Sequence, residues 1–371
     1  MGRPHRHHAR QGSQSPAEDI YYYVKLTNLP KPAKNGSALI VLKATADKGT
    51  TIADGDILWS WHLWFTDYAP DYNSSDDAID SASISGTGVV TPVKNGVTHR
   101  YNGAAFGTSG SYPNGQGMMD RNLGSTYSAA STSISDMIDD HIDDGSAVSA
   151  DNFNALRGMY YQFGRKDPFP HTGSGKVIIN TITVKDGNGA DFTFINGYVN
   201  GSTPSQRGET TSDLKYAVNN PDTFVSDYEV WHNPRFSYDW PAIFDPSPAG
   251  WSVAKASQEE TSNVWWDFSD DGKVSKSLAF TNDDTTVAGW AGYLVSGTTD
   301  EGTAQWAYYP AAGMIDRAAG CFNLVGSSCV NFSQTSKSVT MGSGLYIIQT
   351  ATYSETSHRR ASALPVRCVK N

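Results

Sequence analysis

The side chains best suited to contact a ligand are aromatic rings that stand beside asparagine and aspartate in loop-like sequence. An exposed ring can stack on the apolar face of a sugar, while a neighbouring carboxylate or amide bonds its hydroxyls. The alternative is that these rings belong to the core, because large aromatic side chains are usually well buried. The sequence gives five candidate ligand-binding residues: Trp231, His232, Trp265, Trp266 and Asp267.

Motifs for catalysis or metal binding are incomplete. The stretch GSGK at 173–176 lacks the first glycine of a phosphate loop, where Pro170 stands, and its final Ser or Thr, where Val177 stands. The acidic turn at 267–272 begins like a calcium loop, but Leu278 replaces the bidentate carboxylate. We therefore assign no catalytic residue, no metal ligand and no cofactor, and calcium alone is left open. A pair of glycosidase carboxylates cannot be identified from linear sequence, so a carbohydrate-active hydrolase is kept as an alternative.

Composition favours a loop-rich extracellular protein built on strands. The 371 residues are 12% aromatic and only 18% charged, and the net charge of −10 disfavours nucleic acid as a partner. No apolar run approaches the roughly 18–20 residues that a membrane span requires. We expect residues 1–19 to form a disordered tail. Because they contain no apolar signal-peptide core, the chain is either cytosolic or a fragment of a longer exported precursor.

Three apolar runs, 20–26, 37–44 and 57–65, are separated by turn-like sequence and predict consecutive antiparallel strands. Alternation along the third run defines two faces. We expect its wholly apolar face to be the core side: Trp59, Trp61, Leu63 and Phe65. We expect its mixed face to be only partly covered: Leu58, Ser60, His62 and Trp64.

Helical spacing and stop signals predict short helices at 133–145, 151–159 and 212–221, the last ending where Pro221 would stop it. Residues 176–184 and 190–197 predict a hairpin closed by the turn DGNG. The predicted fold class is α+β, with strands dominant.

Seven phrases, in this order, resemble the C-terminal domain of Bacteroidales fimbrillin-like cell-surface proteins, which are type V pilus tip subunits related to the Fibrobacter succinogenes major paralogous domain. They are DILWSWHLWFTDY (56–68), MMDRNLG (118–124), GMYYQFGRKDPFP (158–170), YAVNNPDTFV (216–225), IFDPSPAGWSV (243–253), YYPAAGM (308–314) and ALPVRCVKN (363–371).

The resemblance implies a C-type-lectin-like α+β domain, rich in strands and loops with a few short helices. Residues 56–371 would form this domain, and residues 20–55 would be remnant strands of an upstream β-sandwich pilin domain. It also implies a location on the outer membrane or in a fimbrium, with other pilin subunits as partners. The export signal would then lie in a longer precursor.

The resemblance further suggests roles for individual residues. Asp120 and Arg121 would pair to fix a loop, Gly124 would permit its turn, and Arg165 and Asp167 would cap nearby backbone.

The cysteines depart from the family pattern. The family usually has a cysteine in place of Ser247, and that cysteine plausibly bridges the one in the terminal phrase, so Cys368 would be left without its partner here. Cys321 and Cys329 lie eight residues apart and could close a small loop.

These observations lead to one expected function and two alternatives. The expectation is a non-catalytic, adhesin-type binding protein of the cell surface or fimbrial tip, which recognises a glycan or a host or bacterial surface protein. The alternatives are a structural subunit for pilus assembly and a carbohydrate-active hydrolase.

Overall fold

The computed structural model describes about half of the chain in separate stretches. These are residues 36–44, 56–65, 98–100, 117–119, 121–125, 156–171, 183–185, 191–193, 198–199, 217–225, 239–240, 242–258, 263–265, 268, 274–275, 292–299, 304–318, 320–338, 340–348 and 350–371. The following description concerns these residues only.

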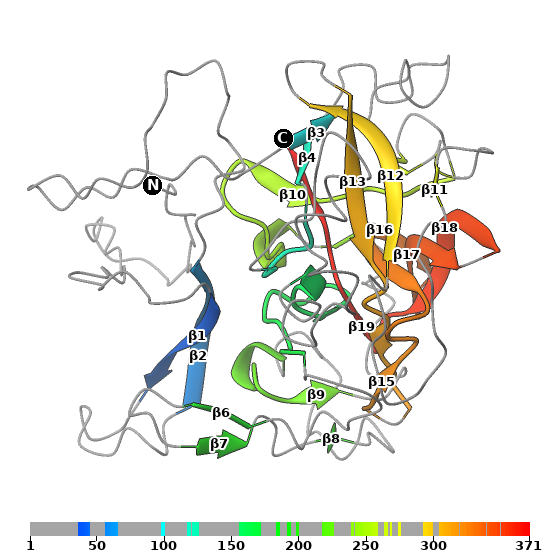
Figure 1. The fold of residues 1–371 in the computed structure, drawn as a ribbon. Coiled ribbons are helices and arrows are strands. Elements are labelled where there is room, and N and C mark those ends of the chain that lie inside the picture. Colours follow the sequence, from blue (N-terminus) through cyan, green and yellow to red (C-terminus); the bar gives the residue numbers. More distant parts are fainter. Residues whose placement is uncertain are drawn as a thin grey trace, which may run out of the picture.

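Strands arranged in small sheets dominate the structure (Figure 1). The largest sheet has the order β10-β20-β4-β3-β12-β11, with β13 paired to β12. Its strands are β3 (Thr98–Arg100), β4 (Gly117–Met119), β10 (Trp251–Val253), β11 (Val274–Ser275), β12 (Gly292–Thr299), β13 (Ala304–Pro310) and β20 (Cys368–Lys370).

Two further sheets pack beside it. One has the order β15-β14-β19-β5, and its strands are β5 (Tyr161–Gln162), β14 (Met314–Ile315), β15 (Phe322–Asn323) and β19 (Ala363–Leu364). The other has the order β16-β17-β18, and its strands are β16 (Cys329–Ser338), β17 (Met341–Ile348) and β18 (Ala351–Arg359).

Three two-stranded sheets complete the strand inventory of the described residues. Their strands are β1 (Gly36–Ala44) with β2 (Asp56–Phe65), β6 (Thr183–Lys185) with β7 (Asp191–Thr193), and β8 (Tyr198–Val199) with β9 (Phe224–Val225). The β1–β2 and β6–β7 pairs are antiparallel. The first confirms the predicted pairing of 37–44 with 57–65, and the second agrees with the predicted hairpin, whose DGNG turn lies outside the described residues. The predicted first strand, 20–26, lies outside the described residues, as does the predicted tail at 1–19.

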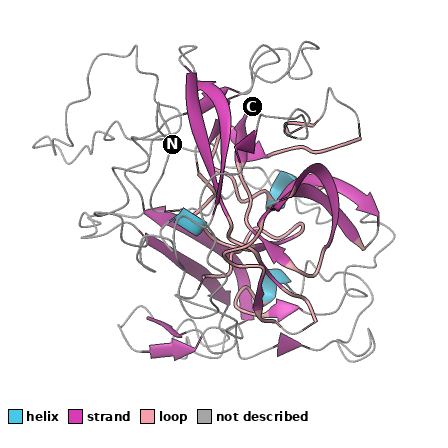
Figure 2. Cartoon of the chain, turned by 45° about the vertical axis from the view of Figure 1, so that its right-hand side comes forward, coloured by secondary structure: helices cyan, strands magenta, loops and turns pink. Residues whose placement is uncertain are grey.

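Helix is almost absent from the described part of the chain, so the predicted α+β class is wrong (Figure 2). Helical turns occur only at 156–157, 217–219, the 3₁₀ turn η6 (Ala242–Phe244) and residue 268. The predicted helix at 151–159 stops at Arg157 because Gly158 adopts a φ of +75° in close contact with Asn122 and Leu123. The helix predicted to stop at Pro221 ends just before it, at residue 219, and its residues before 217 lie outside the described part of the chain. The predicted helix at 133–145 lies outside the described residues.

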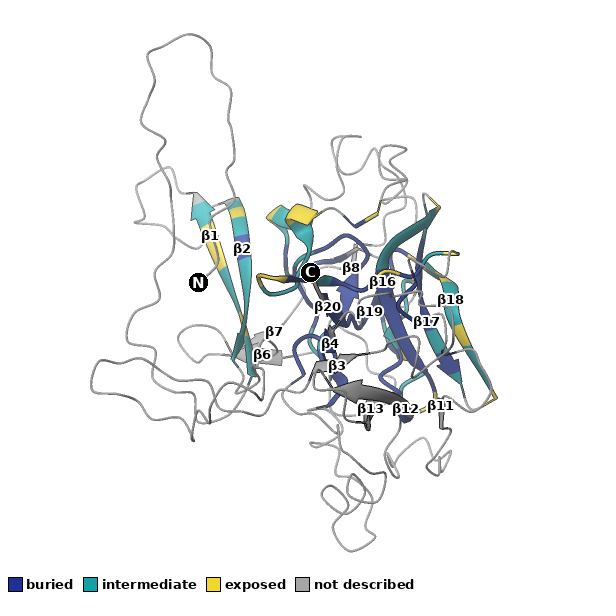
Figure 3. Cartoon of the chain, turned by 90° about the horizontal axis from the view of Figure 1, so that it is seen from above, coloured by how far each residue is buried: buried dark blue, intermediate teal, exposed yellow. Residues whose placement is uncertain are grey.

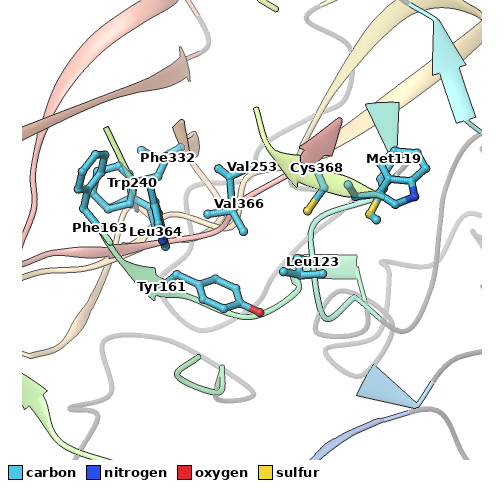
Figure 4. Packing of buried hydrophobic residues seen from close by; sticks show 12 residues of the cluster. Met119, Leu123, Tyr161, Phe163, Trp240, Val253, Phe332, Leu364, Val366 and Cys368 are labelled. Atoms are coloured by element: carbon cyan, nitrogen blue, oxygen red, sulfur yellow. The ribbon is translucent and has the colours of Figure 1, made fainter. Parts of the chain in front are cut away.

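The C-terminal segment is buried and links strands of two sheets. Residues 360–369 are buried throughout, and Figure 1 shows this red segment running through the middle of the fold. β19 joins β14 to β5, and β20 joins β10 to β4. Around it packs the main hydrophobic cluster, most of which is shown in Figure 4: Met119, Leu123, Tyr161, Phe163, Trp240, Trp251, Val253, Val330, Phe332, Leu364, Val366 and Cys368.

Buried arginines link this core to the surrounding loops. Four of them lie over aromatic rings: Arg157 over Phe322, Arg165 over Phe169, Arg360 over Phe163 and Arg367 over Tyr309, at 3.7–5.2 Å from guanidinium carbon to ring centroid. A guanidinium on a ring face gains a cation–π contact while its N–H groups remain free to bond backbone carbonyls. Arginine therefore serves here as a core residue.

Candidate functional site

The structure places one of the five predicted ligand-binding residues in the core. Trp265 is fully buried, its Nε1 donates to the hydroxyl of Tyr309 at 3.3 Å, and its backbone N–H donates to Oδ1 of Asn263. Its ring has no face open to a sugar. The other four lie outside the described residues, and ligand binding by them stays a prediction: Trp231, His232, Trp266 and Asp267.

The segment that contains Trp265 is attached to the edge strand β18. The side-chain amide of Asn263 donates to the backbone carbonyls of Ser257 and Ser354, at 3.1 and 3.4 Å. Ser354 follows Tyr353, which is the most exposed aromatic side chain among the described residues, at 48%. The fold thus holds the predicted aromatic segment next to a strand on which an aromatic ring faces solvent.

Tyr353 belongs to an aromatic surface that the sequence analysis missed. Its ring stacks on that of Tyr346, its cross-strand partner on β17, with centroids 6.1 Å apart and an interplanar angle of 17°. Tyr346 packs against the main core cluster and meets His358 edge-on. We call Tyr346, Tyr353 and His358 the β18 aromatic surface. Figure 3 shows that β18 has exposed stretches, whereas β16 and β17 are mainly buried.

His358 is a neutral ring at the base of this surface. Burial, together with the charge of Lys337, lowers the pKa of His358 to about 4. Its Nε2 is buried without a hydrogen-bond partner, and its ring lies edge-on to Phe332. At neutral pH the aromatic surface therefore carries no charge of its own.

A second polar group of residues lies where β2 meets the body of the protein. The hydroxyl of Ser60 donates to Asp167 Oδ1 at 2.7 Å, and Lys166 Nζ contacts both carboxylate oxygens at 2.8 and 2.9 Å. Lys166 also donates to the backbone carbonyl of Ser60 and lies over the ring of Trp59. We call Ser60, Lys166 and Asp167 the hairpin anchor, because these contacts fix the β1–β2 hairpin to the 156–171 segment.

Chemistry at the hairpin anchor is limited by burial. Ser60 is fully buried, so no substrate can approach its hydroxyl. Beside it, Tyr161 bonds Nδ1 of His62 at 3.4 Å, and burial lowers the pKa of His62 to about 4. Burial also raises the pKa of the Tyr161 hydroxyl. These groups are held neutral or paired, which suits a structural contact.

The face of β2 that is most buried is not the face expected to be the core side. Ser60 is the only buried residue among those of β2 whose exposure is described, and Trp64 of the same face packs against the main core cluster. The face expected to be the core side, Trp59 to Phe65, is only half-buried. The prediction was wrong because Ser60 is buried through its hydrogen bond to Asp167, whereas Trp59 of the other face contacts Phe244 and Lys166 without being buried. Apolar alternation alone carries no information about such a partner.

The roles suggested for individual loop residues can be compared with their contacts in the structure. Gly124 has a φ of +82°, which confirms its turn. Arg165 donates to the backbone carbonyls of Thr223 and Asn220 at 2.6 and 3.0 Å, which confirms its capping role. Within the described residues, the carboxylate of Asp167 contacts the side chains of Ser60 and Lys166, and the capping role predicted for it stays a prediction. Asp120, the predicted partner of Arg121, lies outside the described residues.

All three cysteines are free thiols. The small loop that Cys321 and Cys329 could have closed is not formed by a disulfide: Cys329 starts β16 and its thiol contacts Asn331 at 3.2 Å. Cys368 lies 3.0 Å from the hydroxyl of Ser247. The position at which the family pattern places a cysteine is therefore in direct contact with Cys368.

The described residues contain no group of three or more His, Cys, Asp or Glu side chains arranged to hold a metal ion. Within the same residues, no helix is long and apolar enough to cross a membrane.

Comparisons with known proteins give no match: no protein-family model, no curated protein and no solved structure is significantly similar to this chain. The site and its chemistry are therefore argued from this chain's own residues.

Proposed function

We propose that the protein is a non-catalytic binding protein of the cell surface or fimbrial tip, which recognises a glycan or a surface protein. The observation that carries this proposal is Tyr353, an exposed ring that stacks on the partly buried Tyr346 and lies on a strand of mainly hydroxyl side chains. Tyrosines in this position supply large contact area at low entropic cost. The seven family-like phrases and the acidic, strand-rich composition support the same function.

The test is binding of the purified chain to a broad glycan array and to immobilised host and bacterial surface proteins, with and without a calcium chelator. We expect reproducible binding to a restricted set of ligands by the wild-type chain. A chelator effect would add calcium to the site. If neither the array nor the surface proteins are bound at high protein concentration, the proposal is overturned.

A second function, that of an assembly subunit, is favoured by the free edge of β1. Within the described part of the chain β1 pairs with β2 alone, and it exposes Val41 and Leu42 at 36% and 43%. Proteins normally protect a sheet edge with charges or proline, and β1 carries only Lys43. An edge of this kind can accept a strand from another chain.

The assembly function is tested by light scattering over a concentration series. An assembly subunit forms multimers that Val41→Lys abolishes, because the buried charge opposes strand addition. A wild-type chain that stays monomeric over the whole series, alone and with the family's pilin subunits, rules this function out.

A further inference from the structure

The ring of Tyr353 is positioned to receive a flat ligand on one side only. Tyr346 covers one face at a stacking distance of 6.1 Å, and nearly half of the Tyr353 side chain faces solvent. Tyr346 is in turn fixed by the main core cluster and by the edge-on contact with His358. The ring orientation is thus established before any ligand arrives, so little side-chain entropy is lost on binding.

The strand that carries this ring is rich in neutral hydroxyl side chains: Thr352, Ser354, Thr356 and Ser357. Thr352 and Ser354 are the chain neighbours of Tyr353 and point to the opposite face of the sheet. Across a β-bulge, Tyr353 pairs with Tyr346 and Thr356 pairs with Gly344, so Thr356 shares the face of Tyr353. Gly344 has no side chain, and the ring of His358 lies over it.

Most of the ionisable side chains on β18 are ion-paired within the protein or neutral. Glu355 forms an ion pair with Lys337 at 2.6 Å, and His358 is neutral above its lowered pKa of about 4. The chain as a whole carries a charge of −10, which opposes an anionic ligand. The remaining charged group of β18 is Arg359, at the far end of the strand.

From these observations we infer that Tyr353 is the stacking platform for the apolar face of a neutral pyranoside, with Thr356 as a hydroxyl partner beside it. The inference rests on the proposed binding function and names its ligand class. A pyranose ring offers an apolar C–H face to an aromatic ring and hydroxyls to its neighbours. A single platform gives weak monovalent affinity, and multivalent display strengthens it through avidity.

The competing explanation is that the tyrosine pair only stabilises the sheet. Cross-strand aromatic pairs contribute roughly 0.2–1 kcal/mol, so removal of one ring would then lower stability slightly and leave binding unchanged. The two explanations differ in whether loss of the Tyr353 ring weakens ligand binding. Because the ring pair contributes little to the free energy of unfolding, Tyr353 variants will fold.

The experiment uses bead-multimerised full chain and a panel of immobilised neutral methyl pyranosides, with glucuronide as the anionic comparison. Variants are Tyr353→Ala, Tyr353→Trp and the matched control Ile243→Ala, which removes an equally exposed apolar side chain (45%) from η6. We expect neutral pyranosides to be bound, glucuronide to be disfavoured, and Tyr353→Ala to lose about tenfold or more. Tyr353→Trp and Ile243→Ala retain binding.

Three outcomes would overturn the inference. Glycan binding by the wild type that Tyr353→Ala leaves intact places the sugar elsewhere and keeps the proposed function. If the chain binds surface proteins but no pyranoside, the sugar is excluded as the ligand and the proposed binding function is kept. If the chain prefers glucuronide, the neutral pyranosides are excluded as the ligand class.

Discussion

At the scale of single residues, Ser247 and Cys368 form a close contact between distant segments of the chain. Their Oγ and Sγ atoms are 3.0 Å apart in a partly buried setting, and the two residues are 121 positions apart in sequence. Burial raises the pKa of Cys368, so its thiol stays protonated and unreactive in the folded protein. A cysteine at position 247 would therefore stand beside the thiol of Cys368.

We predict that Ser247→Cys forms a disulfide with Cys368 and stabilises the fold by about 2–4 kcal/mol, because a long loop is closed in the unfolded chain. Intact-protein mass spectrometry with and without reductant detects the bond, and denaturant unfolding measures the gain. Ser247→Cys combined with Cys368→Ala is the control, and it should gain nothing. A variant that stays fully reduced under oxidising refolding would show that the backbone cannot accept the bridge.

At the scale of elements, the β1–β2 hairpin depends on a few polar contacts. Asp167 is the centre of the hairpin anchor, since it accepts from Ser60 on β2 and pairs with Lys166. The side chains of Lys166 and Asp167 are 10% and 1% exposed, so the pair is largely desolvated. Loss of one partner then leaves a buried charge uncompensated.

We predict that Asp167→Ala destabilises the protein by about 3–5 kcal/mol and that most of the local loss falls on β2. Thermal or urea unfolding gives the total, and hydrogen exchange over 56–65 gives the local effect. Asp167→Asn keeps an acceptor for Ser60 and should cost less. Unchanged exchange protection in β2 would mean that the apolar contacts of Trp59 and Trp64 alone hold the hairpin.

At the scale of the whole molecule, three buried histidines make stability depend on pH. Burial lowers the pKa of His62 and His358 to about 4 and that of His171 to about 3, from an ordinary value of 6.5. The unfolded chain therefore binds more protons than the folded chain between pH 6.5 and about 4. Stability is fully present above pH 6.5 and falls as the pH is lowered through this window.

We predict a loss on the order of 3 kcal/mol per histidine across that window, measured as the urea midpoint at half-unit pH steps. His358→Gln should flatten the slope, because glutamine does not titrate. A midpoint that is constant from pH 6.5 to 4.5 would show that the folded protein accommodates protonated histidines. Such a result would contradict the assignment of neutral buried rings.

The sequence predicted local structure well where local chemistry decides it. Alternating aromatics gave β2 and its pairing with β1, the predicted hairpin contains the antiparallel β6–β7 pair, and Gly124 gave a turn. Pro221 follows the end of a helical segment for the same reason, since proline restricts the residues before it. The predicted helix at 151–159 ends two residues early, because periodicity cannot show that Gly158 must pack against Asn122 and Leu123.

Burial was decided by the tertiary structure alone. Trp265 and Tyr353 are both large aromatics beside polar residues, yet one is enclosed by Tyr309 and the other stands open on an edge strand. Ser60 is buried because Asp167, 107 residues away, accepts its hydrogen bond. Composition and local pattern determined that this chain is rich in strands, turns and aromatic rings. Which rings form the core and which are left for a ligand depends on contacts between distant segments, and these exist only once the chain has packed.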